Sequence, residues 1–441
     1  MIALFGVGAF VYLFYNFLVY ALCLIALPYL LFQIIFSSKN REMFLQKLGF
    51  VPREVWAGCQ GDPRIWIHAV SMGEVSAIHP LIRELQVRYP KGAILLSTTT
   101  ASGIKIARER VREANAVFFF PFDIPIVLSR VLRRARPGLF ILAETELWPN
   151  VLRLAKRAGA RTLLVNGRIS QRSFPRYRKT RFFWTAVFDN LDCLSMIRVP
   201  DGERVIMAGA NPVHVFVNGN CKFDQAALSV NAAHEEEMRR LLDLGQADRV
   251  FVAGSTHEGE EEAVIQAYRE MLRKHPGLIL VLVPRHVDRV PRVEKLLTQM
   301  GLPDYILRSR LESGGRMGRK VVLWDTFGEL FKVYSIAALV FCGASLVPKR
   351  GQNILEPAAW GKPVLYGPSM EDFMDAKELL EGCSAGITVR SAADLAETGS
   401  RLLDYPQEMV NRGNLAREAV VSNRGATRRN AELAIRLLEG P

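Results

Sequence analysis

The sequence is poor in cysteine, and its six cysteines are scattered over 441 residues with no pair at C-x-x-C spacing. That pattern excludes a disulfide scaffold and predicts reduced thiols in a cytosolic environment. The seven histidines show no zinc-site spacing either. No predicted strand leads into a Walker loop, a Gly-x-Ser-x-Gly elbow or a dinucleotide-binding Gly-x-Gly-x-x-Gly. The sequence therefore disfavours an NTPase, a hydrolase and a dehydrogenase.

Charge is missing from the first 38 residues, since the first charged side chains are Lys39 and Arg41. About 20 apolar residues cross a bilayer, so the segment from Ile2 to about Ala26 is long enough to span one. It lacks the basic start of a secretory signal peptide, and its apolar run is too long for one. The two cations after the segment predict that the rest of the chain lies on the cytoplasmic side.

The sequence leaves the form of this anchor, residues 1–38, open. Pro28 is expected to kink or end the helix, leaving Tyr29 to Phe36 as an interfacial segment rich in aromatic residues. The alternative to a membrane-spanning helix is a hydrophobic helix that packs against the body of the protein or lies in one leaflet.

The remaining sequence is that of a globular protein, with 49% hydrophobic and 23% charged residues and a net charge of +13. Between Arg130 and Arg181 there are 14 Lys and Arg against two acids, Glu144 and Glu146, which gives +12 in 52 residues. Next to a membrane anchor, such a surface favours anionic lipid headgroups or a phosphorylated lipid substrate. A solvated charged face is the alternative, and nucleic acid is disfavoured because no known binding motif accompanies the cluster.

Short apolar runs alternate with turns and amphipathic stretches along the soluble part. The runs are 65–70, 93–97, 139–143, 162–165, 250–253, 278–283, 321–323, 338–341 and 364–366. At least nine such runs predict parallel sheets covered by helices on both faces, arranged as two doubly wound α/β domains. The polar stretch at about 222–233 predicts the boundary between them. The last helix, at about 426–438, is expected either to complete the second domain or to cross back to the first.

Four predicted turns between a strand and a helix carry a capping residue with Glu three positions later. Capping alone accounts for any one of these glutamates. In open α/β sheets, however, ligands bind beyond the carboxyl ends of the strands, where helix N-termini also favour phosphate. Arg285 stands at such an end, and Lys222 lies where the two domains are expected to meet. Either could neutralise charge on a phosphate leaving group, or be an exposed cation or a cap at the end of a strand. The four turns are 71–74 (SMGE), 255–258 (STHE), 326–329 (TFGE) and 353–356 (NILE).

Eight ordered motifs make the chain resemble the Kdo (3-deoxy-D-manno-octulosonic acid) transferases of lipopolysaccharide biosynthesis. They recur in the order of that family from about residue 40 to 375, and the apolar N-terminus agrees as well. The motifs are 68–74 (HAVSMGE), 143–150 (AETELWPN), 166–170 (NGRIS), 219–224 (GNCKFD), 255–261 (STHEGEE), 283–286 (VPRH), 325–330 (DTFGEL) and 353–357 (NILEP).

The resemblance implies a GT-B glycosyltransferase fold, with two Rossmann-like domains facing a central cleft and an N-terminal membrane helix. The expected domains are an acceptor-binding domain at 39–223 and a domain at 224–441 that binds the nucleotide sugar. The implied reaction is an inverting transfer of Kdo from CMP-Kdo to the tetra-acylated lipid A precursor (lipid IVA) at the bacterial inner membrane, with no metal or other cofactor and no nucleic-acid partner.

Roles for particular residues also follow from the resemblance. Glu74 is the expected proton acceptor, and Glu144 and Lys222 are the expected transition-state stabilisers. A Glu at a helix N-terminus is expected to stay ionised and to be a weak base, which suits an oxocarbenium-like sugar centre. The residues expected to contact CMP are Pro284, Arg285, Phe327, Gly328, Glu329, Asn353, Ile354, Leu355 and Glu356.

Three departures from the family pattern lie near the predicted nucleotide site. Arg350 replaces Gly and Gln352 replaces His, while Asp372 stands where Asn is usual. These changes keep two rival functions open. One is a GT-B enzyme that transfers another nucleotide sugar to a lipid, and the other is a catalytically silent lipid-binding relative.

Overall fold

The computed structural model describes residues 2–313 and 315–440 and contains two compact units. Unit 1 comprises the chain as far as Gln225 together with the residues from Arg424 onward, and unit 2 is Ala226–Asn423. The expected second domain at 224–441 is therefore wrong at its C-terminal end.

Helix α19 (Ala426–Glu439) explains this difference. Its buried residues Ala426, Leu433 and Ala434 belong to the hydrophobic core of unit 1. Asp224 holds the start of the helix, because its carboxylate accepts from the backbone N–H groups of Gly425 (2.7 Å) and Thr427 (3.0 Å). Of the two positions left open for the last helix, the structure adopts the return to the first unit.

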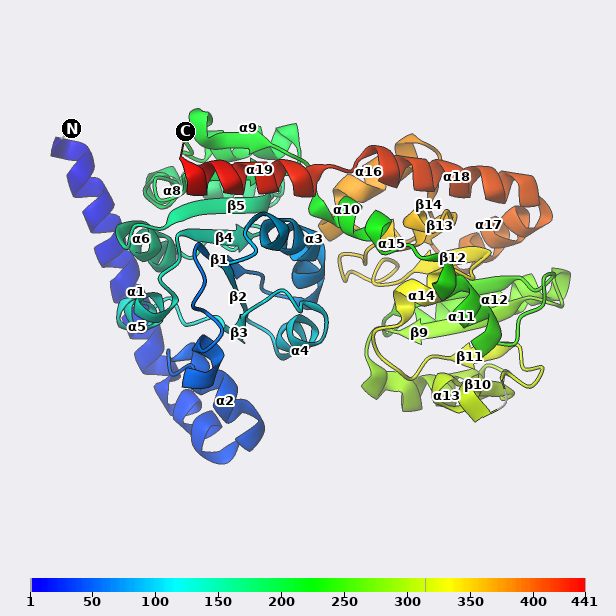
Figure 1. Cartoon of the computed structure of the whole chain (residues 1–441). Helices are drawn as coiled ribbons and strands as arrows, with labels where there is room; N and C mark the ends of the chain where they lie inside the picture. Colours follow the sequence, from blue (N-terminus) through cyan, green and yellow to red (C-terminus); the bar gives the residue numbers. More distant parts are fainter. Residues whose placement is uncertain (1, 314, 441) are drawn as a thin grey trace. The chain divides into compact units, whose positions relative to one another are not determined.

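Unit 1 is built around one parallel sheet of seven strands in the order β3-β2-β1-β4-β5-β6-β7 (Figure 1). Its strands are β1 (Arg64–His68), β2 (Ala93–Thr98), β3 (Ala116–Phe119), β4 (Leu139–Ala143), β5 (Arg161–Gly167), β6 (Cys193–Met196) and β7 (Val215–Val217). Its helices include α1 (Ile2–Phe36), α2 (Ser38–Lys47), α3 (Met72–Arg88), α4 (Ala101–Arg110), α5 (Pro125–Ala135), α6 (Pro149–Arg157), α7 (Phe174–Lys179), α8 (Arg181–Phe188) and α9 (Val199–Met207), and α10 (Cys221–Leu228) leads into unit 2.

Each face of this sheet carries its own hydrophobic core, because side chains alternate along a strand. Trp66 on β1 and Phe140 on β4 belong to one core, whereas Ile65 and Ile67 belong to the other. Strand β4 is apolar along its whole length and β1 is apolar at Ile65, Trp66 and Ile67, as the sequence predicted for strands buried on both faces of a parallel sheet.

Unit 2 repeats the architecture, with a parallel seven-stranded sheet in the order β10-β11-β9-β8-β12-β13-β14. The strands are β8 (Val250–Thr256), β9 (Ile279–Pro284), β10 (Tyr305–Leu307), β11 (Val321–Leu323), β12 (Leu339–Cys342), β13 (Val364–Tyr366) and β14 (Gly386–Thr388). The helices are α11 (Ala232–Leu241), α12 (Glu261–Lys274), α13 (Val290–Gln299), α14 (Leu330–Tyr334), α15 (Leu355–Ala359), α16 (Met374–Gly382), α17 (Ala392–Asp404) and α18 (Pro406–Ser422).

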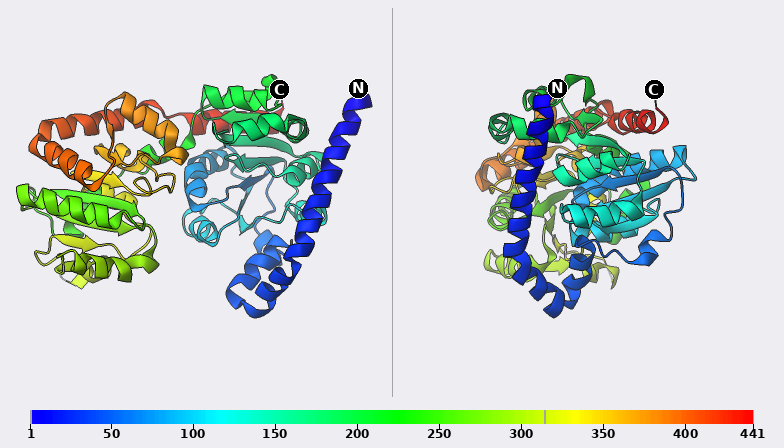
Figure 2. Two further views of the ribbon diagram at one scale, coloured as in Figure 1. Left: turned by 180° about the vertical axis from the view of Figure 1, so that it is seen from behind. Right: turned by 90° about the vertical axis from the view of Figure 1, so that its left-hand side faces the viewer.

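The apolar N-terminus forms one long helix, α1, which runs along unit 1 and leads into α2 (Figure 2). Pro28 was expected to kink or end the helix; it lies inside α1, so the helix does not end there, and the kink stays a prediction. By length and composition, Gly8–Phe36 is a candidate membrane span.

Candidate functional site

Glu74 lies in the first turn of α3, directly after the carboxyl end of β1. Ser71 is the N-cap, and its Oγ accepts from the Glu74 backbone N–H at 3.4 Å. In return, the Glu74 carboxylate accepts from the Val70 backbone N–H at 2.7 Å and from the Ser71 hydroxyl at 3.0 Å. The predicted capping box is confirmed here, and it fixes the position of the carboxylate.

Glu144 and Lys222 form an ion pair at the same edge of the sheet. Glu144 follows β4 with a positive φ of 58°. Its Oε1 lies 2.6 Å from the Nζ of Lys222, which stands in the first turn of α10, after β7. The two side chains are 22% and 18% exposed, so the pair is only partly screened by water.

The pKa of Glu74 is raised from 4.5 to about 7. Burial is the largest cause, and the negative charge of Glu144 is the next; the hydrogen bonds from Val70 and Ser71 oppose the shift. The expectation that Glu74 is a weak base held ionised by its helix N-terminus is therefore wrong, because burial and a neighbouring carboxylate outweigh the helix dipole. A pKa near 7 suits a general base at neutral pH.

The place where the strand order of unit 1 reverses lies between β1 and β4. This is the position at which open α/β sheets bind ligands. Glu74 and Glu144 follow these two strands, and Lys222 is paired with Glu144. The structure therefore brings together the three residues expected to carry the chemistry.

Sequence reasoning gave no role to two side chains that hold this edge of the sheet in place. Asn166, on β5 with a φ of 56°, accepts from the Cys221 backbone N–H at 3.0 Å and so fixes the start of α10, beside Lys222. The Thr145 Oγ1 accepts from the Arg168 backbone N–H at 2.8 Å and donates to the carbonyl oxygen of the same residue. Both lie within quoted motifs, but their partners are distant in sequence.

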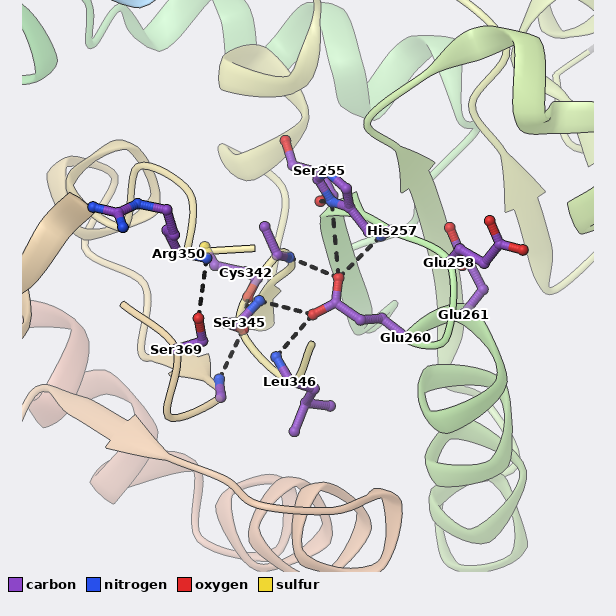
Figure 3. Close-up of polar contacts among 12 residues, drawn as sticks. Ser255, His257, Glu258, Glu260, Glu261, Cys342, Ser345, Leu346, Arg350 and Ser369 are labelled. Carbon is purple, nitrogen blue, oxygen red and sulfur yellow. Dashed lines mark hydrogen bonds and ion pairs between the residues drawn. The ribbon is translucent and has the colours of Figure 1, made fainter. Parts of the chain in front are cut away.

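In unit 2 the strand order reverses between β8 and β12, and the buried Glu260 joins the two loops that follow these strands (Figure 3). Its carboxylate accepts from the His257 backbone N–H at 2.9 Å, on the β8 side. From the β12 side it accepts from the backbone N–H groups of Ala344 (2.6 Å), Ser345 (2.8 Å) and Leu346 (2.9 Å). One carboxylate thus shapes both loops.

We expect Glu260→Gln to lower the free energy of unfolding by about 2–4 kcal/mol. An amide cannot accept from all four N–H groups, and its own NH₂ would face donors without a buried acceptor. Urea denaturation measures the change. Glu258→Gln is the matched control, because the Glu258 side chain is 73% exposed and pairs with Arg289, so its loss should cost no more than about 0.5 kcal/mol. Equal losses for the two variants would contradict the role assigned to Glu260.

Residues expected to contact the nucleotide lie at the carboxyl ends of β9 and β11. Pro284 ends β9, and the backbone N–H of Arg285 donates to the Thr256 carbonyl at 2.9 Å. After β11, Phe327 is 47% exposed. Glu329 is held by Arg308 at 2.8 Å.

Glu329 is an ionised anchor of its turn. Burial acts to raise its pKa, but hydrogen bonds from Arg308, Thr326 and Trp324 outweigh this and hold the pKa below its ordinary value. The side chain is therefore occupied within the turn, which leaves the backbone and the exposed Phe327 ring to face a ligand.

The third group, 353–356, follows the loop after β12. Ile354 and Leu355 are 0% and 1% exposed, so their side chains belong to the core and only their backbone could meet a nucleotide. The Asn353 side chain accepts from the Leu355 backbone N–H at 3.2 Å and donates to Glu356 at 3.2 Å.

The predicted capping boxes at 255–258 and 326–329 are wrong, because α12 and α14 begin only at Glu261 and Leu330. Glu260, which lies two residues beyond the predicted Glu258, accepts from the His257 N–H instead. At 353–356, Asn353 does accept from the Leu355 backbone N–H at the start of α15 and contacts Glu356, as the pattern predicted.

Two of the departures from the family pattern bind each other. The Arg350 guanidinium donates to Asp372 Oδ1 through Nε at 3.0 Å and Nη2 at 2.7 Å. The Arg350 backbone N–H donates to the Ser369 hydroxyl at 3.0 Å, so the loop after β12 is tied to the loop after β13. Arg350 has a φ of 73°, a conformation that glycine adopts without strain.

We expect Arg350→Gly to change the free energy of unfolding by less than about 1 kcal/mol. Relief of the left-handed backbone, worth about 1 kcal/mol, offsets the loss of an ion pair worth about 0.2–1 kcal/mol at 43% and 37% exposure. Asp372→Asn alone should be destabilising, and less so in the Arg350→Gly background. Urea denaturation of the four proteins measures this coupling. Strictly additive effects would show that the pair makes no contribution.

Among the residues that the structure describes, no group of three or more His, Cys, Asp or Glu side chains could hold a metal ion. Metal independence remains a prediction.

The sequence is similar to those of known proteins. The sequence model of the family described as 3-Deoxy-D-manno-octulosonic-acid transferase (kdotransferase) matches residues 42–225. A 3-deoxy-D-manno-octulosonic acid transferase of Haemophilus influenzae is 32% identical over 405 residues, which cover 91% of this chain and 93% of that protein. The enzyme of the same name from Chlamydophila psittaci is 28% identical, over 90% of this chain and 89% of its own.

A solved structure extends the agreement to the fold. The UDP-GlcNAc 2-epimerase of Neisseria meningitidis bound to UDP-GlcNAc covers 85% of this chain and 99% of its own, with a TM-score of 0.59 and 14% sequence identity. At this identity the likeness concerns the fold alone, which is the GT-B class with two Rossmann-like units.

Proposed function

The chain belongs to the Kdo transferase family and is a glycosyltransferase, and from this premise we propose that it transfers Kdo from CMP-Kdo to a hydroxyl of the tetra-acylated lipid A precursor. The transfer inverts the anomeric carbon and releases CMP. The observation that carries the proposal is the raised pKa of Glu74 beside the Glu144–Lys222 pair, at the ligand-binding edge of unit 1.

In this mechanism, Glu74 takes the proton of the acceptor hydroxyl as the oxygen attacks the anomeric carbon. The departing group is a phosphate ester, so no acid is needed to protonate it, and cations and backbone N–H groups stabilise it instead. Lys222 and Glu144 stabilise the transition state. Inversion follows if the hydroxyl attacks from the face opposite the departing phosphate.

Unit 2 supplies the donor site in this proposal. Pro284, Arg285, the 327–329 turn and the backbone of 353–356 contact the CMP moiety. The loops held by Glu260 lie between these groups, at the place where the strand order reverses.

In this proposal the reaction takes place at the cytoplasmic face of the bacterial inner membrane, where the lipid acceptor would be found. The apolar helix α1 supports membrane association. The basic cluster 130–181 would hold the phosphates of the acceptor at that surface.

A nucleotide-release assay tests the choice of donor. Purified protein in detergent receives lipid IVA and, in turn, CMP-Kdo from a generating system or a UDP-sugar. We expect release of CMP that requires the lipid and no release of UDP. Release of UDP alone would favour a different donor, and acceptor binding without release of any nucleotide would favour the catalytically silent relative.

A further inference from the structure

Helix α1 is attached to unit 1 near its N-terminal end by buried polar bonds. The hydroxyl of Tyr12, a residue 4% exposed, accepts from Asn190 Nδ2 at 2.9 Å and lies 3.3 Å from the Pro149 carbonyl oxygen. One turn later, the Tyr15 hydroxyl donates to Asp123 Oδ2 at 2.9 Å. These contacts connect α1 to α6, to the end of α8 and to the loop before α5.

The partners of α1 are themselves fixed in the body. Asp123 and Asn150 are 5% and 2% exposed. The Asp123 carboxylate also accepts from the backbone N–H groups of Asn150 and Val151, both at 2.9 Å. The Asn150 side chain in turn donates to Asn16 Oδ1 at 2.7 Å. This part of α1 is thus joined to a buried hydrogen-bond network and does not rely on apolar contacts alone.

The other end of α1 is attached through α2. The Gln46 side chain, 1% exposed, accepts from the Phe119 backbone N–H of β3 at 2.9 Å. Gln33 near the end of α1 accepts from Asn40 of α2 at 2.9 Å. Both ends of the helix are therefore fixed to the same folded unit.

This double attachment is incompatible with a bilayer crossing. From Tyr12 to Phe36 the helix rises about 36 Å at 1.5 Å per residue, and the hydrocarbon core is about 30 Å thick. If α1 crossed the core with its contacts intact, α6, α8 and the buried Asp123 would enter the hydrocarbon. The free-energy cost of moving the polar and charged groups of these elements into hydrocarbon is prohibitive.

The opposite side of α1 is apolar and open. Between 55% and 77% of Phe10, Leu13, Phe14, Phe17, Leu24 and Ile25 is exposed. Such a continuous apolar stripe is typical of a helix that lies in a membrane interface.

The charge on the helices next to α1 indicates which kind of membrane surface its apolar face contacts. Helices α6 and α8, which contact α1, and α7, which lies between them in the sequence, carry exposed cations. They are Lys156, Arg157, Arg176, Arg178, Lys179 and Arg181. Cations beside an apolar stripe complement anionic headgroups above acyl chains.

We propose that α1 lies along unit 1 within one leaflet of an anionic phospholipid bilayer and does not cross it, so that both ends of α1 are on the same side. This inference rests on the membrane association proposed above, and not on the donor or the acceptor.

Protease accessibility tests the sidedness. The full chain carries a cleavable tag before Met1 and another after Pro441, and protease is added to intact spheroplasts or to inverted membrane vesicles. We expect both tags to be protected in spheroplasts and both to be cut in inverted vesicles. If the N-terminal tag of membrane-bound protein were cut in spheroplasts, the in-plane position would be overturned while membrane association stood. Recovery in the soluble fraction, for example as a dimer that buries α1, would overturn both.

Vesicle flotation tests the face that enters the leaflet. Phe17→Glu and Leu24→Glu should each weaken partitioning onto phosphatidylglycerol vesicles about tenfold or more, because each replaces an exposed apolar side chain, which the proposal places among the acyl chains, with a charged one. Val87→Glu on α3, 83% exposed in the wild type, is the matched control and should bind normally. Replacing phosphatidylglycerol with phosphatidylcholine should weaken wild-type binding. Unchanged binding of both α1 variants would contradict the proposal.

Discussion

Replacing Glu74 by Gln should lower kcat by about 10²–10⁴-fold, because the variant keeps the shape of the side chain but cannot accept the hydroxyl proton. The amide can still accept one of the two hydrogen bonds that Val70 and Ser71 donate to the carboxylate. Steady-state transfer rates of wild type and variant measure the effect. A variant that retains a tenth or more of wild-type kcat would exclude Glu74 as the base.

The pH dependence of the wild type should report the same group. With a pKa of about 7, Glu74 is the active carboxylate only above that value, so kcat/KM should rise with pH and level off above 7. In Glu74→Gln this acidic limb should disappear. A wild-type profile that is flat from pH 5.5 to 8 would contradict the assignment.

Measuring stability shows whether the Glu74→Gln variant still folds. The direction in which Glu74 changes stability with pH follows from its pKa in the folded and unfolded states. The unfolded carboxyl loses its proton near 4.5 whereas the folded one keeps it until about 7, so Glu74 makes the folded state less stable as pH rises through this window. Glu74→Gln removes that penalty. Thermal melts should therefore show a variant at least as stable as wild type at pH 8, together with the loss of activity.

Lys222→Met should lower kcat by about 10²–10³-fold, the effect expected when one preorganised charge is removed from a transition state. It should also change the pH profile. Without its partner 2.6 Å away, the negative charge of Glu144 acts more strongly on Glu74 and raises the pKa of that carboxyl further. The acidic limb of kcat/KM should move to higher pH.

Glu144→Gln is the complementary variant. It removes a charge that raises the pKa of Glu74, so its acidic limb should move to lower pH, opposite to that of Lys222→Met. Two shifts in the same direction would show that the pair does not set the pKa of the base. A role for Lys222 in folding alone would leave the pH profile unchanged.

The central strands of both sheets could be predicted from sequence because they are continuous apolar runs. β1, β4, β8 and β9 were all located, since a strand buried on both faces leaves a clear signal. The strands that were missed lie at or near the edges. β10 and β14 have three residues each, β3 has four, and β6 contains the polar Ser195. Such strands are defined by pairing with their neighbours rather than by their composition.

The positions of Glu74, Glu144 and Lys222 could be predicted because each follows a strand and lies in a motif. The pKa of Glu74 could not, because it depends on burial and on Glu144, 70 positions away in the sequence. The return of α19 to unit 1 depends in the same way on the contact between Asp224 and Thr427. These are tertiary effects without a local signature.

The departures at positions 350 and 372 show a similar limit. Each looked like a separate disturbance of the donor site in the sequence, but the structure joins the two side chains in one ion pair. Asp372 thus holds the Arg350 side chain, and the two substitutions together form one ion pair within unit 2. Gln352 has no such explanation in the structure.

The mass of the lipid product tests the central claim most directly. Wild-type protein is incubated in detergent with lipid IVA and a CMP-Kdo generating system, beside the Glu74→Gln variant and a known homologue. We predict that the lipid gains mass in whole Kdo units with wild type and not with the folded variant. If folded wild-type protein left the lipid unchanged under conditions in which the homologue converts it, the account of this protein as a Kdo transferase acting on lipid IVA would be contradicted.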